Sequence, residues 1–193
     1  MIILASKSER RIELLKKLTQ DFKVVPPEVK EDIGFKDAAS LVLRLSLLKA
    51  ESIVSNYPVI GSDTVVSIEG SVFGKPKDAG QALEILKCLS GKTHEVMTGI
   101  CIAYKNMRML FFEKTKVTFN KLTEPELKDY IERFKPYDKA GSYGIQDNFN
   151  LVSKIDGDYD NVLGLPITTL RKKLQDFEKL TEEKWLTLNL QSI

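Results

Sequence analysis

The chain has 193 residues, of which 42% are hydrophobic, and its 29 basic and 27 acidic residues leave a net charge of +2. This size and composition are typical of a globular protein with one substantial core, and the near balance of charge argues against a general affinity for nucleic acid or membrane surfaces. No apolar run approaches the length of a membrane span, and the opening residues are too short for the core of a signal peptide. We therefore expect a cytoplasmic protein.

The predicted elements alternate along the chain. Apolar patterning places strands at residues 2–5, 22–26, 59–68, 71–73, 93–105 and 108–119. It places helices just after the first strand, from about 37 to 55, from 78 to 89, from Thr123 and after Pro166. Residues 140–146 and 156–160 are rich in turn formers. The pattern predicts a mixed α/β fold, a single domain in which helices cover a partly antiparallel sheet.

The first fifteen residues, MIILASKSERRIELL, join a strand to a helix through two serines. A helix N-terminus presents unpaired N–H groups, and Arg10 and Arg11 add two guanidiniums to the same turn. Ser6 and Glu9 fit a capping box. The stretch either binds a phosphate or is an ordinary capped surface helix with solvated arginines.

A carboxylate interrupts the predicted strand VIGSDTVVSI. Asp63 lies between β-branched residues, where aspartate is disfavoured and a buried charge needs a partner. It either marks a turn between two strands or projects from a strand end into a charged cleft. In a cleft it can accept a proton from water or hold a metal.

Further polar residues are expected near the ends of elements. Lys49 borders the apolar face of the second predicted helix and Lys75 follows the hairpin, so each is a solvated lysine or faces a cleft. Glu31 and Asp32 form a solvated loop or supply oxygen ligands for a cation. Gln146, in GSYGIQ, either brings its amide to the edge of a base or turns the chain.

The rarer residues exclude several kinds of site. Cys88 and Cys101 lie in different predicted elements, and we interpret both as buried apolar side chains. The single histidine, His94, lies in a segment typical of a turn that enters a strand. These residues argue against a Ser-His-Asp triad and against a zinc site with several His or Cys ligands, and a metal here would have oxygen ligands, as magnesium and manganese prefer.

Seven motifs occur in the order LASKSERRIELL, RLSLLKA, GSDTVV, GKPKD, SGKTHEVMTG, DKAGSYGIQ and DGDYDNVLGLP. In this order they resemble the Maf family of nucleoside triphosphate pyrophosphatases, over about residues 1–177, with 178–193 as a tail. The resemblance implies a mixed sheet flanked by helices, similar to inosine triphosphatases, with an active-site cleft between two lobes. Glu9 stands where the family often has a proline, and glutamate also suits a first helical turn.

This resemblance implies an enzyme that hydrolyses a nucleoside triphosphate to the monophosphate and pyrophosphate and so cleans nucleotide pools. Asp63 matches the family's catalytic base, and Glu31 would share a magnesium or manganese ion with it. Whether Asp63 acts as the base or chiefly as a metal ligand stays open. The positions that match the family's phosphate-binding residues are Ser6, Arg11, Lys49 and Lys75.

Substrate choice in the family follows three positions, occupied here by Arg10, Thr64 and Gln146. They resemble the branch that acts on dTTP and UTP, and with them modified pyrimidine nucleotides, rather than the branch that prefers 7-methyl-GTP. A homodimer is common among relatives, whereas nucleic acid and membrane partners are not expected. Two other functions remain open: a non-catalytic nucleotide-binding regulator of cell division and septum formation, and a phosphomonoesterase.

Overall fold

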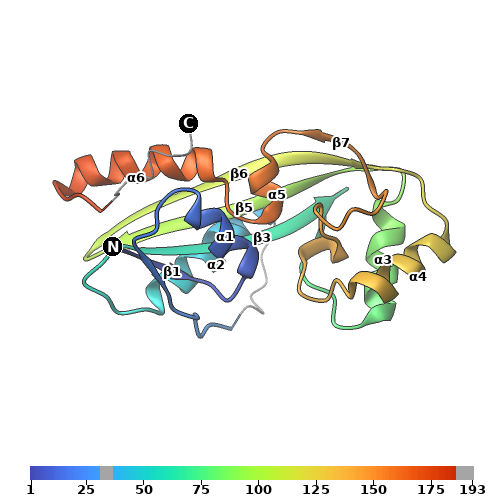
Figure 1. Cartoon of the computed structure of the whole chain (residues 1–193), viewed down its shortest axis with the longest axis horizontal. Coiled ribbons are helices and arrows are strands. Elements are labelled where there is room, and N and C mark those ends of the chain that lie inside the picture. Colours follow the sequence, from blue (N-terminus) through green and yellow to red (C-terminus); the bar gives the residue numbers. More distant parts are fainter. Residues whose placement is uncertain (31–36, 186–193) are drawn as a thin grey trace.

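A seven-stranded sheet forms the centre of the described part of the chain, which comprises residues 1–30 and 37–185 of the computed structural model (Figure 1). Its strands are β1 (Ile2–Ala5), β2 (Phe22–Val24), β3 (Val59–Ile68), β4 (Ser71–Phe73), β5 (Thr93–Tyr104), β6 (Met107–Phe119) and β7 (Val152–Asp156). The order is β2-β1-β3-β5-β6-β7, with β4 beside β3. β1 runs parallel to β2 and β3, and the other pairs are antiparallel.

Helices cover both faces of the sheet around β1, β3 and β5. The helical elements are α1 (Glu9–Lys16), α2 (Ala38–Glu51), α3 (Ala79–Leu89), α4 (Glu124–Phe134), α5 (Tyr159–Leu163), α6 (Ile167–Thr181) and the 3-10 turn η1 (Ala140–Ser142). α1 and α6 pack on one face, where Leu15 and Leu174 share a core cluster with Ile60. α2 packs on the other face, where Ala50 clusters with Cys101. We call this part of the molecule the first lobe.

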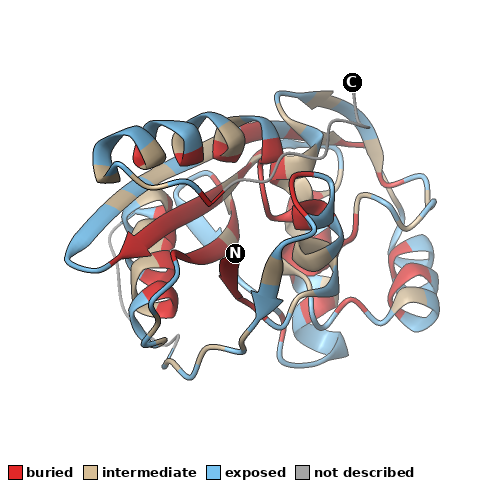
Figure 2. Ribbon diagram, turned by 60° about the vertical axis from the view of Figure 1, so that its left-hand side comes forward, coloured by how far each residue is buried: buried red, intermediate tan, exposed pale blue. Residues whose placement is uncertain are grey.

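A second lobe forms at the far ends of β3, β5 and β6. α3 and α4 lie together there, away from α1 and α6 (Figure 1). Leu86 of α3 and Tyr130 of α4 pack with Val66 and Val117 of the sheet in one hydrophobic cluster. The helices of both lobes are buried on their inner sides and exposed on their outer sides (Figure 2). The long strands of one sheet thus connect two cores.

Three of the predicted helices begin where capping residues end the preceding loop. The carboxylate of Asp37 accepts a hydrogen bond from the Ser40 N–H at the start of α2, and Asp78 does the same for α3. Thr123 and Glu126 form a reciprocal capping box at the start of α4. These bonds satisfy N–H groups that a helix leaves unpaired at its first turn.

The predicted mixed α/β fold is confirmed, but two elements near the C-terminal end were not predicted. β7 is short and mostly exposed, and it pairs with the end of β6 without an apolar pattern of its own. α5 is a five-residue helix whose start is fixed by the Asp158 carboxylate, which accepts from the N–H groups of Asp160 and Asn161. Turn-forming residues therefore cap a short helix here instead of forming an open loop.

His94 and Cys101 are buried structural residues, whereas Cys88 is less buried than predicted. His94 is 1% exposed, and its Nε2 lies 2.8 Å from the hydroxyl of Tyr143. Burial lowers the pKa of His94 to about 4, so the ring is neutral at neutral pH. Cys101 is buried, which raises the pKa of its thiol to about 12, and Cys88 is half-buried.

Two glycines bring α2 unusually close to the sheet. A Cβ atom on Gly61 of β3 would lie 2.1 Å from the carbonyl oxygen of Ser46, and one on Gly99 of β5 would lie 2.4 Å from the carbonyl of Val42. Both contacts involve the backbone of α2, which cannot turn aside as a flexible side chain can. Glycine is therefore required where the helix crosses these strands.

We predict that Gly99→Ala destabilises the protein, because α2 must move away from β5. Overpacking of this kind costs about 1–3 kcal/mol, which lowers the Tm of a chain of this size by roughly 3–10 °C. Thermal unfolding followed by circular dichroism measures the shift. Gly74→Ala is the matched control, because an added Cβ there meets nothing within 4 Å; equal Tm values for the two variants would contradict the close approach.

Candidate active site

One edge of β3 lacks a strand partner in the middle of the sheet. β1 pairs with β3 only as far as Gly61, and β4 begins to pair at Val66, whereas β5 occupies the opposite edge throughout. Among the described residues, Ser62 to Val65 thus have no strand on this side, and we call them the open edge. A pocket of about 800 Å³ lies beside it, lined by residues of both lobes.

All eight described residues that the sequence singled out for a site line this pocket. They are Ser6, Arg10, Arg11, Lys49, Asp63, Thr64, Lys75 and Gln146. Their elements are far apart in the sequence, and the two-lobed fold brings them together. Glu31 and Asp32 lie outside the described residues.

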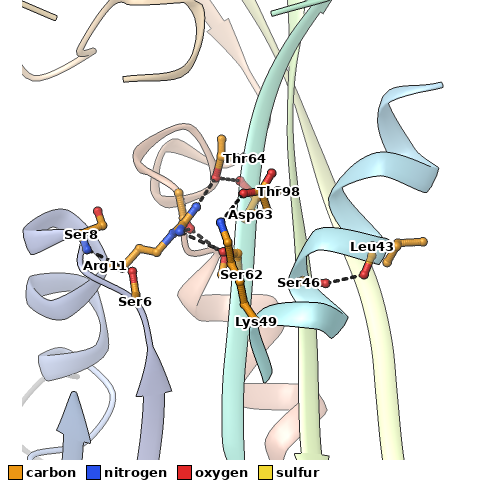
Figure 3. A network of polar contacts seen from close by, with 11 residues as sticks. Ser6, Ser8, Arg11, Leu43, Ser46, Lys49, Ser62, Asp63, Thr64 and Thr98 are labelled. Atoms are coloured by element: carbon orange, nitrogen blue, oxygen red, sulfur yellow. Dashed lines mark hydrogen bonds and ion pairs between the residues drawn. The ribbon is translucent and has the colours of Figure 1, made fainter. Parts of the chain in front are cut away.

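A buried ion pair stands at the centre of the pocket wall. The Lys49 ammonium of α2 lies 2.6 Å from Oδ1 of Asp63, and the two residues are 5% and 7% exposed. Asp63 lies in the middle of a continuous strand, so it is neither the turn residue nor the strand-end residue expected from the sequence. Its side chain shares a strand face with Gly61, two residues earlier, where α2 comes closest. The close approach of α2 therefore places the ammonium against the carboxylate (Figure 3).

Arg11 reaches the same strand from α1, on the other face (Figure 3). Its Nε donates to the Gly164 carbonyl at 2.8 Å, and its two terminal nitrogens donate to the Ser62 carbonyl and the Thr64 hydroxyl, each at 2.9 Å. A guanidinium with several fixed acceptors keeps one orientation. Arg11 is thus held rigidly at the open edge.

A chain of hydrogen bonds inside the protein fixes the Thr64 hydroxyl that Arg11 contacts. The hydroxyls of Thr64 and Thr98 lie 3.0 Å apart, and Thr98 donates to the carbonyl of Asn161. Asn161 is buried and donates in turn to the carbonyl of Val96 and the hydroxyl of Thr115. Sequence reasoning missed these supporting residues. Thr98 gave no signal comparable to that of Asp63, because threonine is uncharged and common in strands.

The start of α1 differs from the predicted capping box. Ser8 is the N-cap residue, and its side chain makes no capping hydrogen bond. Ser6 directly follows β1, two residues before the cap, and its hydroxyl accepts from the N–H of Ser8 at 3.1 Å. Ser6 and Glu9 therefore each lie two residues before the positions that a capping box requires. The Ser8 side chain thus leaves this helix end uncapped, and the helix end lines the pocket.

Arg10 connects the two lobes at the pocket's rim. Its Nη1 lies 2.9 Å from Oδ2 of Asp138, a residue of the loop between α4 and η1. Oδ1 of the same carboxylate lies 2.9 Å from the ammonium of Lys139. Asp138 and Lys139 were not predicted, although both belong to the DKAGSYGIQ motif, and both line the pocket.

Lys75 and Gln146 lie on the second-lobe side of the pocket and are exposed. Lys75 follows β4, as predicted. Gln146 follows η1, where Gly141 and Ser142 adopt left-handed backbone conformations with φ of 70° and 62°. The segment after this tight turn, residues 143–146, lines the pocket.

The described residues hold no group of three or more His, Cys, Asp or Glu side chains suited to a metal ion. Asp63 is the carboxylate residue of the open edge, and one of its oxygens accepts a hydrogen bond from Lys49. A cation here would therefore need ligands from a substrate or from residues beyond those described. His94 lies in the second core and does not line the pocket.

Curated proteins of bacteria resemble this chain over nearly its whole length. A protein of Thermosipho africanus is 50% identical over 176 residues, which cover 91% of this chain and 92% of the relative. Proteins of Bacillus cereus and Carboxydothermus hydrogenoformans are 45% and 46% identical, and the alignments cover 95% and 98% of those relatives. All three relatives are named dTTP/UTP pyrophosphatase.

The Ham1 protein of Staphylococcus aureus has a similar solved structure. The two share 14% sequence identity with a TM-score of 0.52, over 91% of this chain and 98% of that one. At this identity the likeness concerns the fold alone. The model of the Maf-like protein family matches residues 1–177, which include every residue named above as lining the pocket. This match and the full-length relatives show that the chain belongs to the Maf family.

Proposed function

We propose that the chain hydrolyses dTTP and UTP to the nucleoside monophosphate and pyrophosphate, and with them modified pyrimidine nucleotides. The observation that carries the proposal is the buried pair of Lys49 and Asp63 beside an 800 Å³ pocket whose walls are rich in cations. Relatives with 45–50% identity carry the name of this activity. The house-cleaning of nucleotide pools is the physiological role that follows.

The cations of the first lobe bind the phosphates. Arg11 is fixed at the open edge, and the uncapped start of α1 adds backbone N–H groups and the positive end of a helix dipole. The Ser6 hydroxyl lies beside that helix end, and Lys75 lines the same pocket from the second lobe. These donors neutralise the charge that develops as pyrophosphate leaves.

Asp63 acts as the general base on the attacking water. The water attacks between the α- and β-phosphates, its proton goes to the Asp63 carboxylate, and the bond to the leaving pyrophosphate breaks. Lys49 holds one oxygen of the carboxylate at 2.6 Å, which leaves the other oxygen to face the water. A rigid strand keeps the base at a fixed distance from the phosphates.

Magnesium or manganese is the expected cofactor. The residues fit such an ion, because hard divalent cations take one or two protein carboxylates together with phosphate oxygens of the substrate, and Asp63 supplies one carboxylate. When bound, the ion neutralises phosphate charge and lowers the pKa of a bound water. Glu31, proposed as a second ligand, lies outside the described residues, and its role remains a prediction.

Arg10, Thr64 and Gln146 select the base. Gln146 is exposed to the pocket, and its amide offers both a donor and an acceptor to the edge of a pyrimidine ring. Thr64 is tied to Arg11 and Thr98, so the position of its side chain depends on the phosphate-binding arginine.

Two further expectations remain predictions. A homodimer and cytoplasmic residence follow from the resemblance and the composition rather than from a contact. No helix among the described residues is both long enough and apolar enough to cross a membrane.

We predict that the purified protein converts dTTP with magnesium or manganese into equal amounts of dTMP and pyrophosphate, and that a chelator stops the reaction. Nucleotide chromatography and separate assays for pyrophosphate and orthophosphate measure this. The release of orthophosphate with dTDP would indicate a phosphomonoesterase. Binding of dTTP without turnover would indicate a nucleotide-binding regulator.

We predict that Asp63→Asn lowers kcat by at least about a hundredfold, the usual scale for the loss of a general base. Because the substitution also weakens a buried ion pair, circular dichroism is used to verify that the variant is folded. Asp156→Asn is the control, because Asp156 is exposed and does not line the pocket. A kcat for Asp63→Asn equal to that of the control would place the base elsewhere.

We predict that Gln146→Ala raises the transition-state barrier for dTTP and UTP by about 1–3 kcal/mol, because the base edge loses its partner. The value of kcat/KM for these substrates falls accordingly. Activity on 7-methyl-GTP should fall much less. Gln175→Ala, an exposed glutamine of α6 outside the pocket, is the control. An equal loss on all substrates would mean that Gln146 shapes the loop or holds phosphate.

A further inference from the structure

The carboxylate of Asp138 lies between two cations, one from each lobe. Arg10 of α1 approaches its Oδ2 at 2.9 Å, and Lys139 approaches its Oδ1 at the same distance. All three residues line the pocket. An anionic group with two oxygens, each bound by a cation, has the recognition chemistry of a phosphate.

Lys139 is the more buried member of this cluster. Its side chain is 13% exposed, whereas that of Asp138 is 64% exposed. The charged end of this mostly buried side chain contacts a carboxylate that is itself largely in water. Partial burial raises the pKa of Asp138, but the hydrogen bond from Lys139 and the charge of Arg10 outweigh this and lower it, so the carboxylate is ionised.

Two other cations of the site, Lys49 and Arg11, have more permanent partners. Lys49 faces the buried Asp63, and the nitrogens of Arg11 donate to groups of the protein framework. Exposed ion pairs such as those of Asp138 contribute little net stability, so an entering phosphate can displace this carboxylate at small cost. Compared with Lys49 and Arg11, Lys139 and Arg10 can therefore exchange their partner more easily.

We propose that Lys139 is a phosphate-binding residue supplied by the second lobe, and that the Asp138 carboxylate takes the place of a substrate phosphate in the free protein. This inference rests on the proposed function and extends it. Lys139 binds the departing pyrophosphate from the second lobe, while the monophosphate lies nearer to Asp63. When the triphosphate enters, the ion pair between Arg10 and Asp138 breaks, and the ligand connects the two lobes instead.

Titration calorimetry with pyrophosphate and with dTMP, each with magnesium, tests this inference without turnover. Lys139→Met should weaken the Kd for pyrophosphate by about tenfold, the scale of one hydrogen bond between charged groups, and leave the Kd for dTMP nearly unchanged. Lys139→Arg should restore most of the affinity. Asp138→Asn should tighten pyrophosphate binding, because the competing charge is gone. Lys77→Met, an exposed lysine outside the pocket, should bind as the wild type does.

Three results would overturn the inference: an unchanged Kd for pyrophosphate in Lys139→Met, an equal loss for dTMP, or weaker pyrophosphate binding in Asp138→Asn. The last two would mean that the pair only shapes the pocket wall. Turnover of dTTP by the wild type is measured in parallel. The expected binding pattern without release of pyrophosphate from dTTP would reject the proposed function and leave the Lys139 site intact.

Discussion

The approach of α2 to the sheet is the constraint on which the site depends. Gly61 and Gly99 provide the space, and Lys49 lies on α2 directly before Ala50, whose Cβ packs against Gly61. From this distance the lysine side chain reaches Asp63 without water between them. A larger residue at either glycine would move the helix outward and separate two buried charges, each of which is costly to leave unpaired.

Because side chains alternate along a strand, the residues of the open edge point to two different faces of the sheet. Asp63 points toward α2, whereas Thr64 points toward α1 and contacts Arg11. A ligand beside the open edge can reach both faces because no strand of the described chain lies in between. Asp63, the proposed general base, and Thr64, which orients the proposed phosphate-binding Arg11, are thus neighbours on one rigid strand, which fixes their separation more firmly than a loop could.

The sequence predicts the elements that have a strong local signal. Thr123 marks the start of α4 because its cap is formed by neighbours in the chain. β7 has no apolar alternation, and only its pairing with β6 makes it a strand. In the site, Asp63 is conspicuous as a charge among β-branched residues. Its partnership with Lys49, and the contact of Arg10 with Asp138, depend on how distant elements pack, and local patterns do not encode that.

An unpaired strand edge is also a template to which another chain can add a strand, and this is a common route to aggregation. The open edge avoids it by being short, with β1 and β4 at its two ends and charged side chains beside it. Arg11 also takes the Ser62 carbonyl as an acceptor, so part of the backbone's hydrogen-bonding capacity is used within the molecule. The charges that suit the pocket to an anion therefore also keep a foreign strand out of the sheet.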